Sequence, residues 1–158
     1  MRKTELSELE FVLATETDKS NASYIGQWSI EQHTDSLSNE DIAHFIIENA
    51  QGDRVGYVIL TGLKDPHKAV CMKRIANRIK DRGYGKATMK QLLNWVFEST
   101  DAHRVWLHVK DYNQRARHVY ESAGFVTEGL LRESYLYESK FESIVVMSVL
   151  RTEYRAPL

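Results

Sequence analysis

A glycine-rich turn between a strand-like segment and a helix-like segment is the feature that most constrains how this chain can fold. The turn runs from Lys80 to Lys86 and contains Gly83 and Gly85. From Gly85 onward, apolar residues recur at i, i+4, i+7 and i+8, which is the spacing of one helix face. Backbone N–H groups at a helix N-terminus have no partner within the helix, and the macrodipole adds positive potential there. The sequence therefore predicts a strand, an anion-binding turn and a helix in direct succession.

A second motif follows about thirty residues later along the chain. Asn113 is followed by Ala116, Tyr120 and the pair Gly124-Phe125. Ala116 and Tyr120 share one helix face, and the glycine stands where a helix C-cap is expected. Either motif alone would be weak. Together they predict a loop that cradles a diphosphate and a helix that presents a tyrosine hydroxyl to a bound cofactor, with core packing as the other role open to Tyr120.

The remaining patterns predict a mixed α/β domain in the order β, α, α, β, β, β, α, β, α, β, β. Leu9 to Leu13 is interpreted as the first strand, and Thr15 to Leu37 as one or two short helices broken near Gly26. Later strands are predicted at residues 44–48, 55–61, 69–77, 105–109, 125–137 and 144–150. No repeat or linker interrupts the pattern, so residues 1–158 are predicted to form one domain.

Composition narrows the function classes further. Lys and Arg number 21 and Asp and Glu 22, a net charge of −1, which gives no indication of a nucleic-acid partner. The single Cys71 cannot form an internal disulfide, and no Cys/His spacing typical of a metal site surrounds it. No signal-like or membrane-spanning run is visible, so we expect no membrane partner and a reducing, cytoplasmic setting.

The two motifs resemble those of the GNAT N-acetyltransferase superfamily, which uses acetyl-CoA. The superfamily loop is usually Arg/Gln-x-x-Gly-x-Gly/Ala, and Lys80 here takes the first position ahead of Gly83 and Gly85. The segments 24–29, 131–133 and 146–150 are similar to the branch that includes ribosomal-protein alanine N-acetyltransferases (RimJ/RimL-like) and spermidine acetyltransferases. In one respect the chain departs from many similar sequences, because Cys71 stands where they carry a glutamate ahead of Lys73-Arg74-Ile75.

The resemblance implies a fold, a cofactor and a set of site residues. The implied fold is a single-domain mixed sheet of about six to seven strands, splayed in the middle, with about four helices on its faces. The implied cofactor is acetyl-CoA as co-substrate, with no metal, and the implied catalytic residue is Tyr120. The implied cofactor-binding residues are Ile75, Ala76, Asn77, Lys80, Arg82, Gly83, Tyr84, Gly85, Lys86, Asn113 and Arg115.

Acetyl transfer from a thioester to an amine needs a neutral amine, a polarised carbonyl and a proton for the leaving thiolate. Backbone N–H groups on the edge of a splayed strand could polarise the carbonyl. A phenol with a reference pKa of about 10 could donate to the thiolate, a role that suits Tyr120. The proton acceptor for the amine stays open among Glu31, His33, Glu48, Glu133 and a water chain.

Three other functions compete with that of a transferase. A phosphate-loop nucleotide-binding protein is disfavoured, because Lys86 is followed by Ala87 and no hydroxyl stands ready for magnesium. A module that binds acyl-CoA without catalysis and a structural domain that binds only protein partners both stay open. The acceptor also stays open among polyamines, small-molecule amines and protein N-termini, and so does a homodimeric state.

Overall fold

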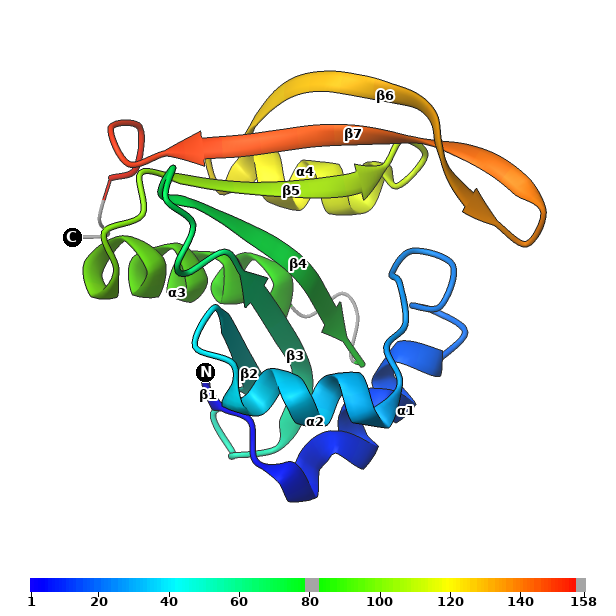
Figure 1. The fold of residues 1–158 in the computed structure, drawn as a ribbon, viewed down its shortest axis with the longest axis vertical. Coiled ribbons are helices and arrows are strands. Elements are labelled where there is room, and N and C mark those ends of the chain that lie inside the picture. Colours follow the sequence, from blue (N-terminus) through cyan, green and yellow to red (C-terminus); the bar gives the residue numbers. More distant parts are fainter. Residues whose placement is uncertain (79–82, 156–158) are drawn as a thin grey trace.

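The computed structural model describes residues 1–78 and 83–155. These residues form a seven-stranded mixed sheet in the order β1-β2-β3-β4-β5-β7-β6 (Figure 1). The strands are β1 (Arg2–Lys3), β2 (Ile42–Glu48), β3 (Arg54–Thr61), β4 (Ala69–Asn77), β5 (Arg104–Lys110), β6 (Val126–Tyr137) and β7 (Lys140–Leu150). The helices are α1 (Leu9–Thr17), α2 (Ile30–Ser38), α3 (Tyr84–Ser99) and α4 (Gln114–Ser122), with a 3-10 turn at Leu6–Glu8. The expected mixed α/β sheet with about four helices is confirmed.

Helices cover both faces of the sheet and enclose two apolar cores. The larger core joins α3 and α4 to one face, where Leu92 and Phe97 pack with Val58, Leu107 and Met147. The smaller core lies on the opposite face, where α1 packs on β2, β3 and β4 through the buried side chains Leu9, Val12, Ile46, Tyr57, Ile59 and Ala76. The sheet is therefore fixed from both sides around β3 and β4.

The sheet is split between β4 and β5. These two strands run parallel and pair from Ala69↔Arg104 to Cys71↔Trp106. Beyond that point they separate, and Figure 1 shows β4 turning away from β5 toward α1 and α2. On its other side β5 stays paired with β7 along its whole length, from Arg104↔Leu150 to Lys110↔Ile144. The expected splay in the middle of the sheet is confirmed.

The prediction of a strand at Leu9 to Leu13 is wrong, because this segment begins α1. The side chains of Leu9, Val12 and Glu16 are buried, and they follow each other at i, i+3 and i+7. The apolar run alone covers five residues, which is too short to separate a strand from a helix. The helical period becomes visible only when the buried polar residues Thr15 and Glu16 are counted with it.

The other predicted elements lie where the patterns placed them, with small differences at their ends. The segment with a break near Gly26 contains the end of α1, a turn region and α2, whose N-terminus is capped by Ser29 Oγ accepting from the Gln32 N–H at 3.2 Å. The two-residue strand β1 was not predicted. No helix within residues 1–78 and 83–155 is long and apolar enough to cross a membrane.

Candidate functional site

A cavity of about 1040 Å³ opens where β4 and β5 separate. We call it the β4–β5 cleft. Its walls come from β4, β5, the N-terminal turn of α3, the inner side of α4 and the loop 19–28 that follows α1. Ten of the predicted site residues line it together: Ile75, Ala76, Asn77, Gly83, Tyr84, Gly85, Lys86, Asn113, Arg115 and Tyr120. The predicted residues Lys80 and Arg82 lie outside the described residues.

The N-terminus of α3 forms one end of the β4–β5 cleft. Gly83 occupies the N-cap position with φ +74°, a left-handed conformation that glycine adopts at low cost, and no side chain caps the helix. The first backbone N–H groups of α3 are therefore available to an anion in the cleft. A Cβ added at Gly85 would lie 3.5 Å from Val119 Cγ1 on α4, so the two helices approach each other closely here.

Beyond Cys71, no strand among residues 1–78 and 83–155 pairs with the edge of β4 that faces the cleft. Ile75, Ala76 and Asn77 lie on this stretch, where β4 pairs with β3 on its other side. The Asn21 side chain from the loop after α1 donates to the Asn77 carbonyl at 3.3 Å, which ties the loop to the end of the strand. Free backbone donors along such an edge can hydrogen-bond an extended ligand as a neighbouring strand would.

A β-bulge interrupts the β3–β4 ladder at the centre of the site. Ile59 pairs with Arg74 and Leu60 pairs with Met72, so Lys73 is the extra residue on β4. A bulge bends its strand and redirects the side chain at that position. Lys73 is exposed and lines the cleft.

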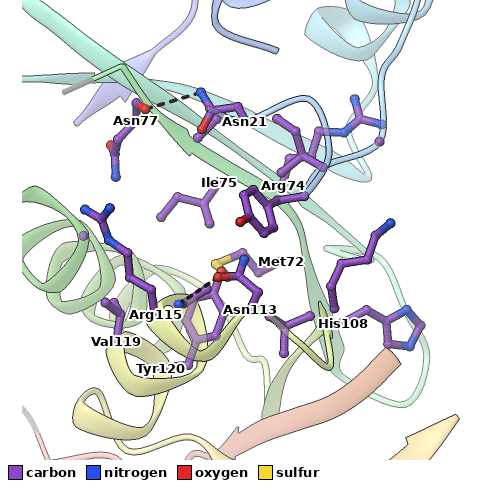
Figure 2. Close-up of a pocket in the computed structure, with 18 of the residues that line it drawn as sticks. Asn21, Met72, Arg74, Ile75, Asn77, His108, Asn113, Arg115, Val119 and Tyr120 are labelled. Carbon is purple, nitrogen blue, oxygen red and sulfur yellow. Dashed lines mark hydrogen bonds between the residues drawn. The ribbon is translucent and has the colours of Figure 1, made fainter. Parts of the chain in front are cut away.

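α4 and its N-cap residue place three of the predicted residues along the cleft, namely Asn113, Arg115 and Tyr120. Figure 2 shows Arg115, Val119 and Tyr120 on the side opposite Ile75. Asn113 caps α4, because its side-chain oxygen accepts from the Ala116 N–H at 3.2 Å.

Tyr120 lies deepest of the predicted residues on α4. Its side chain is 8% exposed and its ring centroid lies 6.0 Å from that of Phe125. Burial in this apolar setting raises the pKa of Tyr120 above its ordinary value. The phenol therefore keeps its proton through neutral pH, and the raised pKa also makes it a weaker acid toward a leaving thiolate than an ordinary tyrosine. Tyr120 contributes to the larger core and also lines the cleft. Its position therefore fits both predicted roles, packing in the core and presenting its hydroxyl to a cofactor.

His108 is a cleft residue that the sequence analysis did not identify. It lies on β5 beyond the split, is exposed, and its ring is 5.1 Å from that of Trp106. Desolvation and the charge of Lys73 lower the pKa of His108, so its imidazole is neutral at pH 7. Alternation along β5 puts Trp106, His108 and Lys110 on one face, and that pattern was the available signal.

The predicted proton acceptors do not line the cleft. Glu48 accepts a hydrogen bond from Arg2 Nε at 2.9 Å at the end of β2, and His33 is fully buried. Glu31 is exposed on α2, and Glu133 is exposed on β6 with φ +48°. Cys71 does line the cleft, but burial raises the pKa of its thiol, which disfavours a thiolate.

A buried polar cluster supports β4 from behind. Arg74 Nη1 lies 2.8 Å from Glu16 Oε1, and the Tyr57 hydroxyl donates to the same oxygen at 2.7 Å. His33 Nε2 lies 3.1 Å from it, at ion-pair distance but outside hydrogen-bond geometry. The Arg74 guanidinium stacks on the Trp28 ring at 4.7 Å. Burial alone would raise the pKa of Glu16, but the hydrogen bonds and the Arg74 charge outweigh it and lower that pKa.

A second ion pair lies at the β5 side of the cleft. Lys110 Nζ donates to Glu142 on β7, and both side chains are nearly buried. The same ammonium lies 4.1 Å from the ring centre of Tyr135 and 4.8 Å from that of Tyr137. Tyr135 also lines the cleft.

Comparisons with known proteins identify the fold and the family. The model of the acetyltransferase (GNAT) family matches residues 10–125, more than half of the chain. The chain is 26% identical to the spermidine N(1)-acetyltransferase of Vibrio cholerae, with 98% of this chain and 94% of that protein covered. It is 21% identical to the spermidine N(1)-acetyltransferase of Escherichia coli K12, with 99% and 88% covered.

A solved structure agrees with these matches. The Vibrio cholerae spermidine N-acetyltransferase in complex with CoA and spermine has a TM-score of 0.87 to this chain, at 24% identity, with 96% of this chain and 95% of that chain covered. This similarity shows a common fold. The chain therefore belongs to the acetyltransferase (GNAT) family, and it is an acetyl-CoA-dependent N-acetyltransferase.

Proposed function

We propose that this enzyme transfers the acetyl group of acetyl-CoA directly to a primary amine while both substrates are bound. The observation that carries the proposal is the continuity of the β4–β5 cleft, which joins the uncapped N-terminus of α3 to Tyr120 and His108. A direct transfer needs both substrates in one space, because positioning two reactants together supplies much of the rate enhancement.

The residues of the cleft fit a CoA-type ligand. The backbone N–H groups from Gly83 to Lys86 would hold the diphosphate, with Lys86 and Arg115 as cations at the same end. The open edge of β4 at Ile75 to Asn77 would hydrogen-bond the extended pantetheine arm. When bound, the thioester supplies an acetyl group that is activated toward a neutral amine.

Tyr120 would donate one proton in the reaction and His108 would accept the other. The Tyr120 hydroxyl keeps its proton and would donate it toward the sulfur as the thiolate leaves. His108 is neutral at pH 7 and would accept the proton from the amine. Among the described residues that line the cleft there is no carboxylate for this second task, which favours the imidazole or a water beside it.

The acceptor is a primary amine whose class the fold alone leaves open. Polyamines are candidates because the named relatives are spermidine acetyltransferases, and small-molecule amines and protein N-termini remain candidates beside them. A homodimer also stays a prediction, which light scattering coupled to size-exclusion chromatography would test.

Two measurements test the proposal. Calorimetric titration with acetyl-CoA measures binding, and release of free thiol in the presence of a panel of amines measures transfer. We expect saturable binding and amine-dependent thiol release with formation of the N-acetylated amine. Binding without amine-dependent release from any amine would contradict the proposed direct transfer.

A further inference from the structure

The charges along the β4–β5 cleft are of one sign. Among the described residues, no aspartate or glutamate lines it. Its charged lining residues are Lys19, Lys73, Arg74, Lys86, Lys110 and Arg115. A cleft lined by one sign of charge attracts ligands of the opposite sign.

Two of these six cations, Arg74 and Lys110, lie in ion pairs with buried or nearly buried carboxylates. Glu16 pairs with Arg74 and Glu142 pairs with Lys110, and both carboxylates lie behind the lining and do not face the cleft. These pairs cancel charge without giving the cleft a negative surface. An acceptor with several ammonium groups therefore meets no described carboxylate in the cleft that could bind it.

The other four cations lie at different places along the cleft. Lys86 and Arg115 lie at the α3 and α4 end, where the diphosphate is proposed to bind. Lys19 belongs to the loop that Asn21 ties to the end of β4. Lys73 lies at the opposite end, two residues after the last β4–β5 pair at Cys71, so the diphosphate does not account for it.

Lys73 is placed for a role at the reacting end. It is the extra residue of the β-bulge, is exposed, and its charge reaches both His108 and Cys71. A second ammonium group on the acceptor would lie beside this like charge, whereas an anionic group would pair with it. The aromatic rings of Trp28 and Trp106 add apolar walls on either side.

We propose, on the basis of the transfer function proposed above, that the acceptor is a small primary amine that also carries an anionic group, a carboxylate or a phosphate, which pairs with Lys73. This acceptor class differs from the polyamines after which the relatives are named. Lys73 is then a specificity-determining residue that selects the acceptor by its charge.

The test compares amines that differ mainly in the charge at the far end. The first pair is γ-aminobutyrate and putrescine, and the second is phosphoethanolamine and ethylenediamine; spermidine is added as the polyamine. Thiol release from acetyl-CoA gives kcat/KM for each amine. We expect at least one anionic amine to exceed its dicationic partner by about tenfold or more. The two pairs distinguish a carboxylate from a phosphate.

The charge of Lys73 is then reversed. Lys73→Glu should lower the ratio of anionic to dicationic amine by about tenfold or more, and Lys73→Met should lower it less. The ratio is measured within each variant, because a change in the basicity of His108 affects both amines alike. Lys90→Glu on the exposed face of α3 is the matched control and should leave the ratio unchanged.

Three results would overturn the proposal. Preference of the wild-type enzyme for spermidine or for the diamines would show that the acceptor is cationic, while the transfer function itself would stand. An unchanged ratio in Lys73→Glu would remove Lys73 from acceptor selection. Bound acetyl-CoA with no thiol release from any amine would contradict the transfer function and, with it, the acceptor class.

Discussion

Cys71 on β4 and Trp106 on β5 are the last residues at which these two parallel strands pair. Beyond them the strands separate, and the open edge of β4, the N-terminus of α3 and the inner side of α4 face one another across the cleft. An ion pair between Arg74 on β4 and Glu16 on α1 joins the strand to this helix. The two residues are 58 positions apart in sequence, and their side chains are 2.8 Å apart.

Removal of the Tyr120 hydroxyl should slow the chemical step. Tyr120→Phe keeps the buried ring, and we expect kcat to fall by about 10²-fold or more with little change in CoA affinity. Single-turnover thiol release and calorimetric titration with CoA measure the two quantities. Tyr154→Phe, which removes a hydroxyl outside the cleft, should leave both unchanged. Equal single-turnover rates for Tyr120→Phe and the wild type would leave Tyr120 as a packing residue.

Side chains at Gly85 should weaken CoA binding without unfolding the protein. The first added carbon meets Val119 at an ordinary contact distance, so Gly85→Ala folds and should gain up to about 1 kcal/mol from helix propensity. Gly85→Val adds methyl groups between α3 and α4, beside the proposed diphosphate site, and should weaken binding by about tenfold or more. Thermal unfolding and calorimetry separate stability from affinity. Wild-type CoA affinity in Gly85→Val would place the diphosphate elsewhere.

The pH dependence of the rate should show the protonation of His108. Its pKa is lowered, so the wild-type enzyme should keep its proton acceptor down to a pH below the ordinary histidine range and lose activity as the imidazole protonates. In His108→Gln this acidic limb should disappear, and the remaining, slower rate should rise toward the amine pKa of about 10. Profiles of kcat/KM against pH with one amine make the comparison. An identical acidic limb in both enzymes would assign the titration to another group.

The folded protein should lose stability in acid, because the protonation of His44 and of Glu16 differs between the folded and the unfolded state. His44 contacts Thr4 and His33, and desolvation together with the charge of His33 lowers its pKa to about 4. The unfolded chain takes up this proton near pH 6.5 and the folded protein does not, so stability should fall as the pH drops from about 6.5 to about 4. The lowered pKa of Glu16 extends the loss to lower pH, where its carboxylate protonates.

The measurement is the free energy of unfolding by denaturant between pH 7 and pH 4. His44→Gln removes the titrating ring and should flatten the curve above pH 4, even though its stability at pH 7 is lower. Glu16→Gln leaves the buried Arg74 without its counter-ion and should cost about 3–5 kcal/mol at pH 7. A wild-type curve that is flat between pH 6.5 and pH 4 would contradict the account of His44.

Strong local periodicity explains what could be predicted from the sequence. The turn at Gly83 and Gly85, the helix after it and the tyrosine of α4 were placed correctly, because each depends on residues close together in the chain. The strand at Leu9 to Leu13 was wrong, because its helical face is completed by buried polar residues that the apolar pattern does not count.

The contacts that complete the site could not be predicted in the same way. The pair of Glu16 and Arg74 joins elements that no local pattern connects. His108 could be assigned to a strand face but not to the cleft, because the gap beside β5 arises from the divergence of β4. The bulge at Lys73 likewise depends on the register with β3, which the sequence of β4 alone does not determine.

We propose that one cleft binds acetyl-CoA and an amine together and that the acetyl group is transferred between them there. The most direct measurement is initial-rate thiol release with acetyl-CoA and the amine varied together, with the acetylated amine quantified by mass spectrometry. We expect intersecting double-reciprocal lines and one acetylated amine for each thiol released. Parallel lines, or tight acetyl-CoA binding with no acetylated amine, would contradict the proposal.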